Sequence, residues 1–255
     1  MSPLESFPGL HAWLETPLGR HVMDWEAACL DRMVVDVFGY NAVQLGIPEC
    51  DFLRANRMPL RLRAGAGRVQ VETDYAALPF ESQSLDLVVL AHVLEFAHHP
   101  HHVLREVERV LVPEGQLIIT GFNPVSLFGL RRRLKGESGS YPWHGQYLST
   151  RRIKDWLELL SFEPGHQSAG CFIPAQTEAE WLQRLRFVER AGERWCGFAG
   201  GVYVLQAVKR VQGMRLIMPK WDRLARARAL APLVSRVGRQ PDPQKTMDEQ
   251  DFGRN

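Results

Sequence analysis

The chain has 255 residues, of which 45% are hydrophobic and 24% charged, and its formal net charge is +2. These values are ordinary for a globular protein, and the length allows one sizeable core with short extensions. No apolar run reaches the ~18 residues that a membrane-spanning helix needs, and the N-terminus lacks a signal-peptide core. The four cysteines are widely spaced, which favours neither a zinc site nor a disulfide framework. We therefore expect a cytoplasmic protein.

The predicted elements begin with a helix and three strands. Residues 25–32 are apolar and charged in a pattern typical of a helix that packs on a sheet, and residues 33–38 predict the first strand. Residues 60–64 and 68–72 predict the second and third strands. Between these two strands, glycines at 65 and 67 indicate a turn.

The middle of the chain predicts a strand, a helix and a further strand. Residues 85–91 form an almost continuous apolar run, typical of a parallel strand covered on both faces. From Pro100 to Leu111 the apolar residues recur at helical spacing. Residues 113–115, Pro-Glu-Gly, then indicate a turn into a strand at 116–120. These lengths fit a parallel crossover unit.

Two more elements follow. Ser149 or Thr150 can cap a helix that ends before Pro164. The alternating stretch 201–211 predicts the last strand, and the chain shows no internal repeat.

The order of short motifs in the middle of the chain carries more information than any one of them. They are Asp74 followed by Leu78-Pro79-Phe80, Leu85-Asp86, Leu94 with Glu95, and Arg109-Val110-Leu111 with Pro113-Glu114-Gly115. This set resembles the central third of class I S-adenosylmethionine-dependent methyltransferases of the type 11 group, with Glu114 in place of a glycine. The resemblance implies an α/β fold, a doubly wound, mostly parallel seven-stranded Rossmann-like sheet with helices on both faces. It also implies transfer of a methyl group from S-adenosylmethionine to a small-molecule acceptor.

The resemblance further implies a cofactor site beyond the first strand, although the family's Asp/Glu-x-Gly-x-Gly-x-Gly loop is altered. Only Gly39 stands near the end of the predicted first strand, and Arg61 and Arg63 lie where the family has a ribose-binding acid. Two interpretations stay open: a rebuilt loop that binds the cofactor, or a non-catalytic fold acting as a binding or regulatory module. The predicted cofactor-binding residues are Asp36, Gly39, Asn41, Asp74, Tyr75 and His92.

His92 is the predicted catalytic residue because it follows the fourth strand directly, where ligands of open α/β sheets bind. It can equally line the cofactor pocket. Glu95 holds the family's Leu-x-Glu position and is expected to anchor the loop. The histidines between 98 and 102 are interpreted as a solvated loop, so no metal site is predicted. Asn123-Pro124 does not match the signature of nucleic-acid amino-methyltransferases.

We predict four parts of the chain: an N-terminal helical lead at 1–30, a methyltransferase-like domain at 31–211, a basic extension at 212–239 and a disordered tail at 240–255. An insertion at about 124–148 combines basic and aromatic residues, as a substrate cover or as a plain surface loop. Residues 209–239 hold nine basic residues and one acid. They predict a solvated extension, or contact with RNA or an anionic membrane surface, so an RNA methyltransferase is a further alternative.

Overall fold

The computed structural model describes residues 9–135, 141–172 and 199–211. The chain divides into two units at residue 212, and all described residues belong to the first. The predicted basic extension and tail lie outside the described residues. The helices are α1 Leu10–Leu14, α2 Pro17–Val34, α3 Pro100–Val110, α4 Leu127–Lys135 and α5 Thr150–Leu159. The strands are β1 Asn41–Leu45, β2 Leu60–Gly65, β3 Val71–Glu72, β4 Leu85–Ala91, β5 Leu111–Phe122, β6 Phe162–Gly170 and β7 Val202–Lys209.

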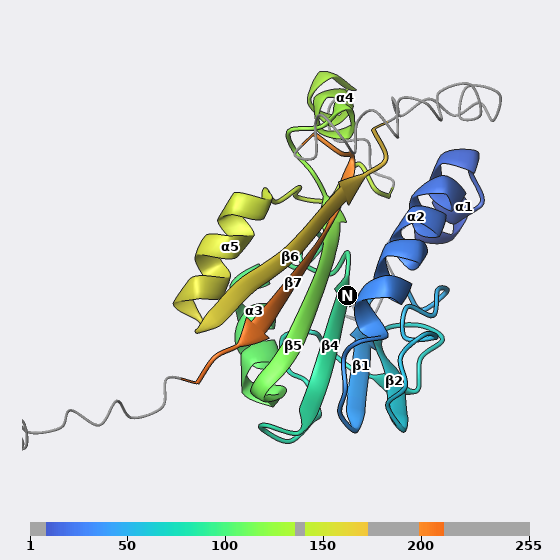
Figure 1. Ribbon diagram of the computed structural model, residues 1–255. Helices are drawn as coiled ribbons and strands as arrows, with labels where there is room; N and C mark the ends of the chain where they lie inside the picture. The colour runs from blue at the N-terminus through green and yellow to red at the C-terminus, as the bar shows by residue number, and fades with distance from the viewer. Residues whose placement is uncertain (1–8, 136–140, 173–198, 212–255) are drawn as a thin grey trace, which may run out of the picture. The chain divides into compact units, whose positions relative to one another are not determined.

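The strands form one seven-stranded sheet in the order β3-β2-β1-β4-β5-β7-β6 (Figure 1). The pairs from β3 to β5 are parallel, whereas β7 runs antiparallel to both β5 and β6. The predicted α/β fold is therefore confirmed. The strand order reverses between β1 and β4, and ligands of open α/β sheets bind beyond the carboxyl ends of the strands at such a point.

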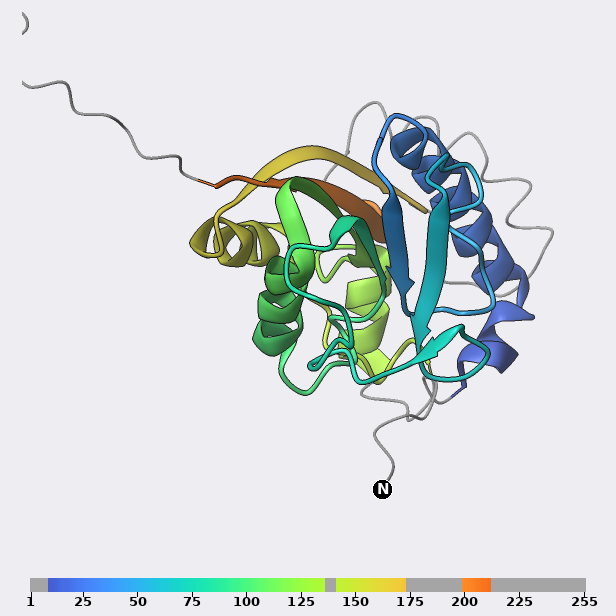
Figure 2. The ribbon, with the colours of Figure 1, turned by 90° about the horizontal axis from the view of Figure 1, so that it is seen from below.

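Helices cover both faces of the sheet, with α1 and α2 on one face and α3 and α5 on the other (Figure 2). Because side chains alternate along a strand, Leu87 and Val89 of β4 join the core beneath α2. Val88 and Leu90 join the core beneath α3. This double burial explains the continuous apolar run at 85–91. Among the described residues, no helix has the length and apolarity to cross a membrane.

The predicted first strand at 33–38 is wrong, because α2 continues to Val34 and the first strand is β1. Met33, Val34 and Val37 are buried because they extend the apolar face of α2 onto the sheet. Residue 31, the predicted start of the domain, lies inside α2. The true β1 was hard to recognise because it begins with Asn41 and contains Gln44, whose side chain is fully buried.

Most of the other predicted elements agree with the structure, with differences at three strands. β3 spans only Val71–Glu72, whereas the predicted third strand covers 68–72. Ser149 caps α5 by accepting a hydrogen bond from the Arg152 amide. β5 begins at Leu111, so residues 113–115 form an irregularity inside the strand, where Glu114 adopts a left-handed φ of 64°. The edge strand β6 was missed because Pro164 and Gly165 interrupt its pattern.

The backbone just after β1 closely approaches the end of β4 at Gly46. Gly46 has a φ of 84°, and a Cβ added there would lie 2.2 Å from the Ala91 carbonyl oxygen. Gly67 also has a positive φ, of 91°, but a Cβ there would only touch Pro48 at 3.7 Å. The backbone conformation restricts both positions, whereas only Gly46 is also restricted by packing.

Substitutions at these two glycines test the close approach of Gly46 to Ala91. Gly67→Ala should lower the free energy of unfolding by about 1 kcal/mol through backbone strain alone. Gly46→Ala should lower it by about 1–3 kcal/mol more, because the carbonyl of Ala91 must move. Urea denaturation measures both. Equal losses of unfolding free energy for the two variants would contradict the close approach of Gly46 to Ala91.

Candidate functional site

The turn after β3 presents an acidic side chain at the carboxyl edge of the sheet. The Asp74 carboxylate is exposed, and its Oδ1 accepts a hydrogen bond of 2.9 Å from the Ala76 amide. Its Oδ2 has no hydrogen bond among the described residues. The buried hydroxyl of Thr73 lies 3.1 Å from the carbonyl oxygens of Asp74 and Ala77 and closes the turn from below. Asp74 is thus held in place with one oxygen available to a ligand.

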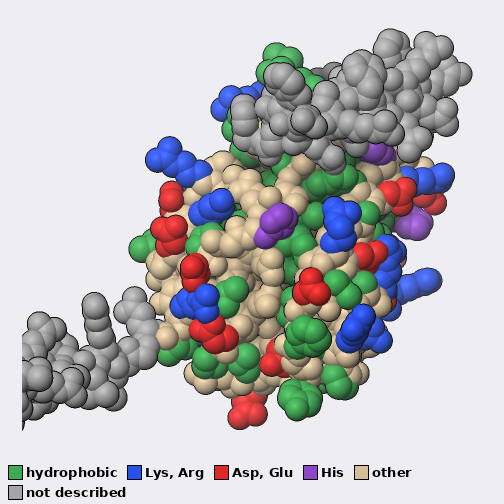
Figure 3. All heavy atoms as spheres, in the orientation of Figure 1, with side chains coloured by type: hydrophobic (Ala, Val, Ile, Leu, Met, Phe, Trp, Pro, Cys, Tyr) green, Lys and Arg blue, Asp and Glu red, His purple; other side chains and the backbone are tan. Residues whose placement is uncertain are grey.

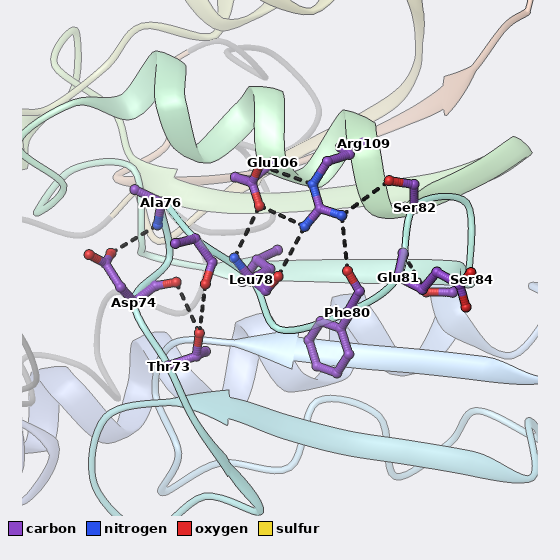
Figure 4. Close-up of polar contacts among 11 residues, drawn as sticks. Thr73, Asp74, Ala76, Leu78, Phe80, Glu81, Ser82, Ser84, Glu106 and Arg109 are labelled. Atoms are coloured by element: carbon purple, nitrogen blue, oxygen red, sulfur yellow. Dashed lines mark hydrogen bonds and ion pairs between the residues drawn. The ribbon is translucent and has the colours of Figure 1, made fainter.

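An ion pair on α3 fixes the segment that follows this turn (Figure 4). Glu106 and Arg109 lie 2.8 Å apart, and a Glu106 oxygen accepts from the Leu78 amide at 3.1 Å. The Arg109 guanidinium donates to the carbonyl oxygens of Leu78 and Phe80, each at 3.0 Å. The hydrogen bond from Arg109 lowers the pKa of Glu106. Two motifs that are separate in the sequence are therefore joined here. Glu106 and Arg109 hold the segment Leu78-Pro79-Phe80, and we call this pair the clamp.

The loop after β1 is organised by the side chain of Gln44. Its amide nitrogen donates to the carbonyl oxygens of Gly46, Ile47 and Cys50 at 2.8–3.2 Å. Its oxygen accepts from the Phe52 amide at 2.9 Å. With β1 placed correctly, residues 44–50 fall on the family's acidic-glycine pattern. Gln44 then stands at the acid, Gly46 at the first glycine, and proline and cysteine at the other two.

Tyr75 occupies the carboxyl end of β2. A Cβ at Gly65, whose φ is 137°, would lie 2.5 Å from the Tyr75 hydroxyl oxygen. Burial raises the pKa of Tyr75 to about 12, although a hydrogen bond with the Ala66 backbone opposes the rise. Arg63, which stands where the family has a ribose-binding acid, is engaged elsewhere, since its guanidinium donates a hydrogen bond to the Pro48 carbonyl oxygen at 2.9 Å. The hydroxyl of Tyr75 therefore packs against Gly65 at the end of β2.

Three predicted cofactor residues lie at the opposite, amino edge of the sheet. The amides of Tyr40 and Asn41 donate to Asp86 Oδ2 at 2.8 and 2.9 Å, and Gly39 packs on the same side chain. Asp36 lines a separate cavity of about 320 Å³ next to β6 and β7. The structure thus does not bring Asp36, Gly39 and Asn41 together with Asp74 and Tyr75, because Asp36 and Gly39 precede β1 and Asn41 is its first residue.

His92 lies between two carboxylates in the core and is fully buried. Its Nε2 is 2.6 Å from Glu26 Oε1 on α2, and its Nδ1 is 2.9 Å from Glu95 Oε2. The other oxygen of Glu95 accepts a short hydrogen bond from the Phe122 amide at the end of β5. We call Glu26, His92 and Glu95 the buried triad. Both ring nitrogens are engaged, so His92 has no free nitrogen to accept a proton from a substrate.

The two carboxylates determine the charge of this imidazole. Burial alone lowers the pKa of His92, but the charges of Glu26 and Glu95 outweigh burial and raise it to about 10. Burial also raises the pKa of Glu26, whose Oε2 is buried and has no hydrogen-bond partner among the described residues. The raised pKa favours the protonated imidazole, and its contacts with Glu26 and Glu95 link α2, the end of β4 and the end of β5.

Aromatic side chains of the predicted insertion cover the carboxyl end of β5. Phe122 contacts the ring of Tyr147 at 5.2 Å, and Phe96 contacts those of Tyr141 and His144 at 5.0 and 4.8 Å. The Gln146 amide donates to the Glu95 carbonyl at 2.7 Å and ties this segment to the loop after β4. The Tyr147 hydroxyl and His144 Nδ1 are buried without a hydrogen-bond partner among the described residues. We call Phe96, Phe122, Tyr141, His144 and Tyr147 the aromatic cover.

Comparison with known proteins identifies the family. A family model described as a methyltransferase domain matches residues 50–119. The uncharacterized protein YafS of Escherichia coli K12 is 42% identical over 166 residues, which cover 64% of this chain and 69% of YafS. The chain belongs to the methyltransferase domain family. Rv2003c of Mycobacterium tuberculosis is 29% identical over 66% of this chain, which spans only 53% of that longer relative.

Solved structures show the same fold at low sequence identity. A chain from the Haloferax volcanii complex between the Trm112 methyltransferase activator and a methyltransferase has a TM-score of 0.57 and 16% identity, over 80% of this chain and 97% of that one. A SAM-dependent methyltransferase of Thermotoga maritima has a TM-score of 0.54 and 17% identity, over 78% and 94%. Geranyl diphosphate methyltransferase, solved with SAM, has a TM-score of 0.51 and 16% identity, over 81% and 96%.

Membership of this family implies S-adenosylmethionine as the cofactor. The described residues fit this molecule at its adenine end. The exposed Asp74 carboxylate has an available oxygen for the adenine amino group. In contrast, the space over Gly46 and Gly65 is already filled by the Ala91 carbonyl and the Tyr75 hydroxyl. Among the described residues, no group of three or more metal-ligating side chains converges. The Asp74 turn therefore fits the adenine end of such a cofactor, whereas the residues after β1 do not form the family's glycine-rich loop.

The buried triad predicts a large cost for removing its imidazole. His92→Ala leaves two buried carboxylates without a counter-charge, which should lower the free energy of unfolding by about 3–5 kcal/mol. His98→Ala, at an exposed neighbouring histidine, should change it by less than about 0.5 kcal/mol. Chemical denaturation at neutral pH compares them. Equal stability of the two variants would contradict the triad.

The triad also predicts a direction for pH dependence. Because the pKa of His92 is raised from 6.5 to about 10, its contribution is complete below pH 6.5 and is lost as pH rises through 10. The stability advantage of the wild type over His92→Gln should therefore shrink from pH 6.5 to 10. An advantage that grows over this range would show that the imidazole is neutral.

The clamp on α3 predicts a local effect. Arg109→Gln should lower the free energy of unfolding by about 1–3 kcal/mol, because two backbone carbonyls and Glu106 lose their charged donor. Arg105→Gln on the exposed face of α3 is the control and should have little effect. Since the pKa of Glu106 is lowered, the part of the cost that comes from the ion pair should be present above pH 4.5 and disappear as the solution becomes more acidic, whereas the part from the two carbonyls should remain. Thermal melts from neutral to acidic pH measure both parts, and a cost that does not fall in acid would contradict the ion pair.

Proposed function

We propose that this protein transfers a methyl group from S-adenosylmethionine to a small-molecule acceptor bound at the carboxyl edge of the sheet. The observation that carries the proposal is the Asp74 turn, an exposed carboxylate with one available oxygen beyond β3. The clamp of Glu106 and Arg109 supports it, because it fixes the chain directly after that carboxylate. In this proposal Asp74 accepts a hydrogen bond from the adenine amino group, and Tyr75 lies beside it.

Methyl transfer from S-adenosylmethionine requires few catalytic side chains. S-adenosylmethionine supplies a methyl group already activated on a sulfonium, so alignment and exclusion of water account for much of the acceleration. The aromatic cover can exclude water at the end of β5, and its buried Tyr147 hydroxyl can orient an acceptor. His92 is a positioning residue in this proposal, since both of its nitrogens are engaged within the triad. The acceptor then reacts without a proton transfer to His92.

A second candidate function is a non-catalytic binding module on the same fold. The loop after β1 supports it, because Pro48 and Cys50 stand in place of two glycines and the loop from Gly46 to Pro48 is buried. Such a loop gives a cofactor less backbone to approach than a glycine loop does. The predicted RNA-methylating alternative depends on the basic extension and lies outside the described residues.

Titration with S-adenosylmethionine and S-adenosylhomocysteine distinguishes the candidates. The full chain should bind at least one of them by calorimetry, and Asp74→Ala should weaken binding by about 1–3 kcal/mol, because a hydrogen bond to a carboxylate is lost. Asp155→Ala, which removes an exposed carboxylate on α5, should leave the affinity unchanged. No heat and no thermal shift at millimolar ligand would reject the enzyme in favour of the binding module.

A further inference from the structure

Three leucines of α4 point into solvent. Leu127, Leu130 and Leu134 have exposed fractions of 45%, 50% and 77%, and Val125 just before the helix has 67%. The leucines recur at positions i, i+3 and i+7, so they share one face of the helix. Single exposed apolar residues are common, but four within ten residues make an unusual concentration of exposed apolar side chains at this helix.

The opposite side of α4 is fixed to the protein. Phe128 is fully buried and contacts the rings of Phe122 and Trp143 at 6.1 Å. The Arg132 guanidinium donates to the Trp143 carbonyl at 3.1 Å and lies over the Tyr147 ring. A rotation that turned the leucines inward would break these contacts. The apolar face is therefore held outward.

Positive charge borders this apolar face. Residues 124–135 contain no acid, and Arg131 and Arg133 lie on α4 next to the leucines. Arg131 stacks over Trp143 at 4.8 Å, and Arg133 borders a hollow of about 350 Å³ together with Val125, Leu127 and Leu130. In Figure 3, hydrophobic side chains reach the surface over α4 with basic side chains beside them. An apolar helix face with arginines at its border is typical of a helix that lies in a membrane interface.

We propose that the exposed face of α4 docks on the surface of an anionic phospholipid bilayer. The leucines would enter the boundary between headgroups and acyl chains, and Arg131 and Arg133 would contact the phosphates. A second copy of the chain fits less well, because a two-fold contact through this face would bring arginines against arginines. RNA would leave the leucines without a partner, since single-stranded nucleic acid stacks on aromatic side chains. The proposal does not depend on methyl transfer.

The position of α4 gives the docking a consequence for the site. The helix begins five residues after Phe122, the last residue of β5, so it stands at the carboxyl edge of the sheet (Figure 1). Trp143 contacts α4 and neighbours His144 of the aromatic cover. A membrane bound by α4 would therefore lie beside the aromatic cover, within reach of an acceptor dissolved in lipid.

Vesicle flotation of the full chain tests the proposal. The wild type should float with vesicles of equal parts phosphatidylcholine and phosphatidylglycerol, and far less with pure phosphatidylcholine. Leu130→Gln with Leu134→Gln should reduce the partition coefficient on the order of tenfold or more, because two leucines no longer enter the interface. Leu159→Gln, at a leucine 83% exposed on α5, is the control and should float like the wild type. Unchanged thermal melts of all variants confirm that folding is intact.

Several outcomes would overturn the proposal. If the double leucine variant floats like the wild type, another part of the chain binds the membrane. If the wild type fails to float, or floats equally with pure phosphatidylcholine, the anionic surface is not the partner. If the wild type sediments as a dimer that the double variant dissociates, without flotation of either, the face serves self-association. If the wild type binds RNA oligonucleotides and not vesicles, and the double variant loses that binding, the exposed face of α4 binds RNA.

Discussion

A histidine held between two buried acidic side chains joins the parts of this fold that surround the proposed site. Glu26 comes from the N-terminal helix α2, His92 and Glu95 follow β4, and Glu95 also accepts from the amide of Phe122 at the end of β5. Desolvating such charges is costly, so a structure that retains them depends on all partners being present. The Glu95 carbonyl in turn accepts from Gln146 within the aromatic segment. Loss of the imidazole would loosen the helix, the strand ends and the aromatic cover together.

The proposed site combines residues that match the family's motifs with residues that differ from them. The turn of Asp74 and its clamp by Glu106 and Arg109 match the family's motifs and have a shared physical role, because each motif holds another in place. At β1, the Gln44 amide organises the loop through four hydrogen bonds to backbone groups. A loop stabilised in this way does not need several glycines to hold its shape, but it offers fewer exposed amides to a cofactor. The adenine end is therefore the better-supported half of the proposed site.

Much of the fold could be predicted from the sequence, because buried parallel strands and amphipathic helices have distinct periodicities. β4, α3 and α5 were predicted from apolar pattern and capping alone. The first strand was misplaced because the end of α2 and a short strand are both apolar. In addition, the polar Gln44 interrupts the apolar pattern of β1. That error placed Asp36, Gly39 and Asn41 at the wrong edge of the sheet. The signal that could have corrected it is the Gln-x-Gly pattern at residues 44–46. The triad could not be predicted, because Glu26 and His92 are 66 positions apart.

The central claim is that the carboxyl edge of this sheet, and not the cavity beside Asp36, receives the cofactor. A crystal structure of the full chain with S-adenosylhomocysteine tests it most directly. We expect the adenine amino group within hydrogen-bond distance of the Asp74 carboxylate, with Tyr75 adjacent. A nucleoside bound in the cavity of Arg32, Asp36 and His166, away from Asp74, would contradict the account.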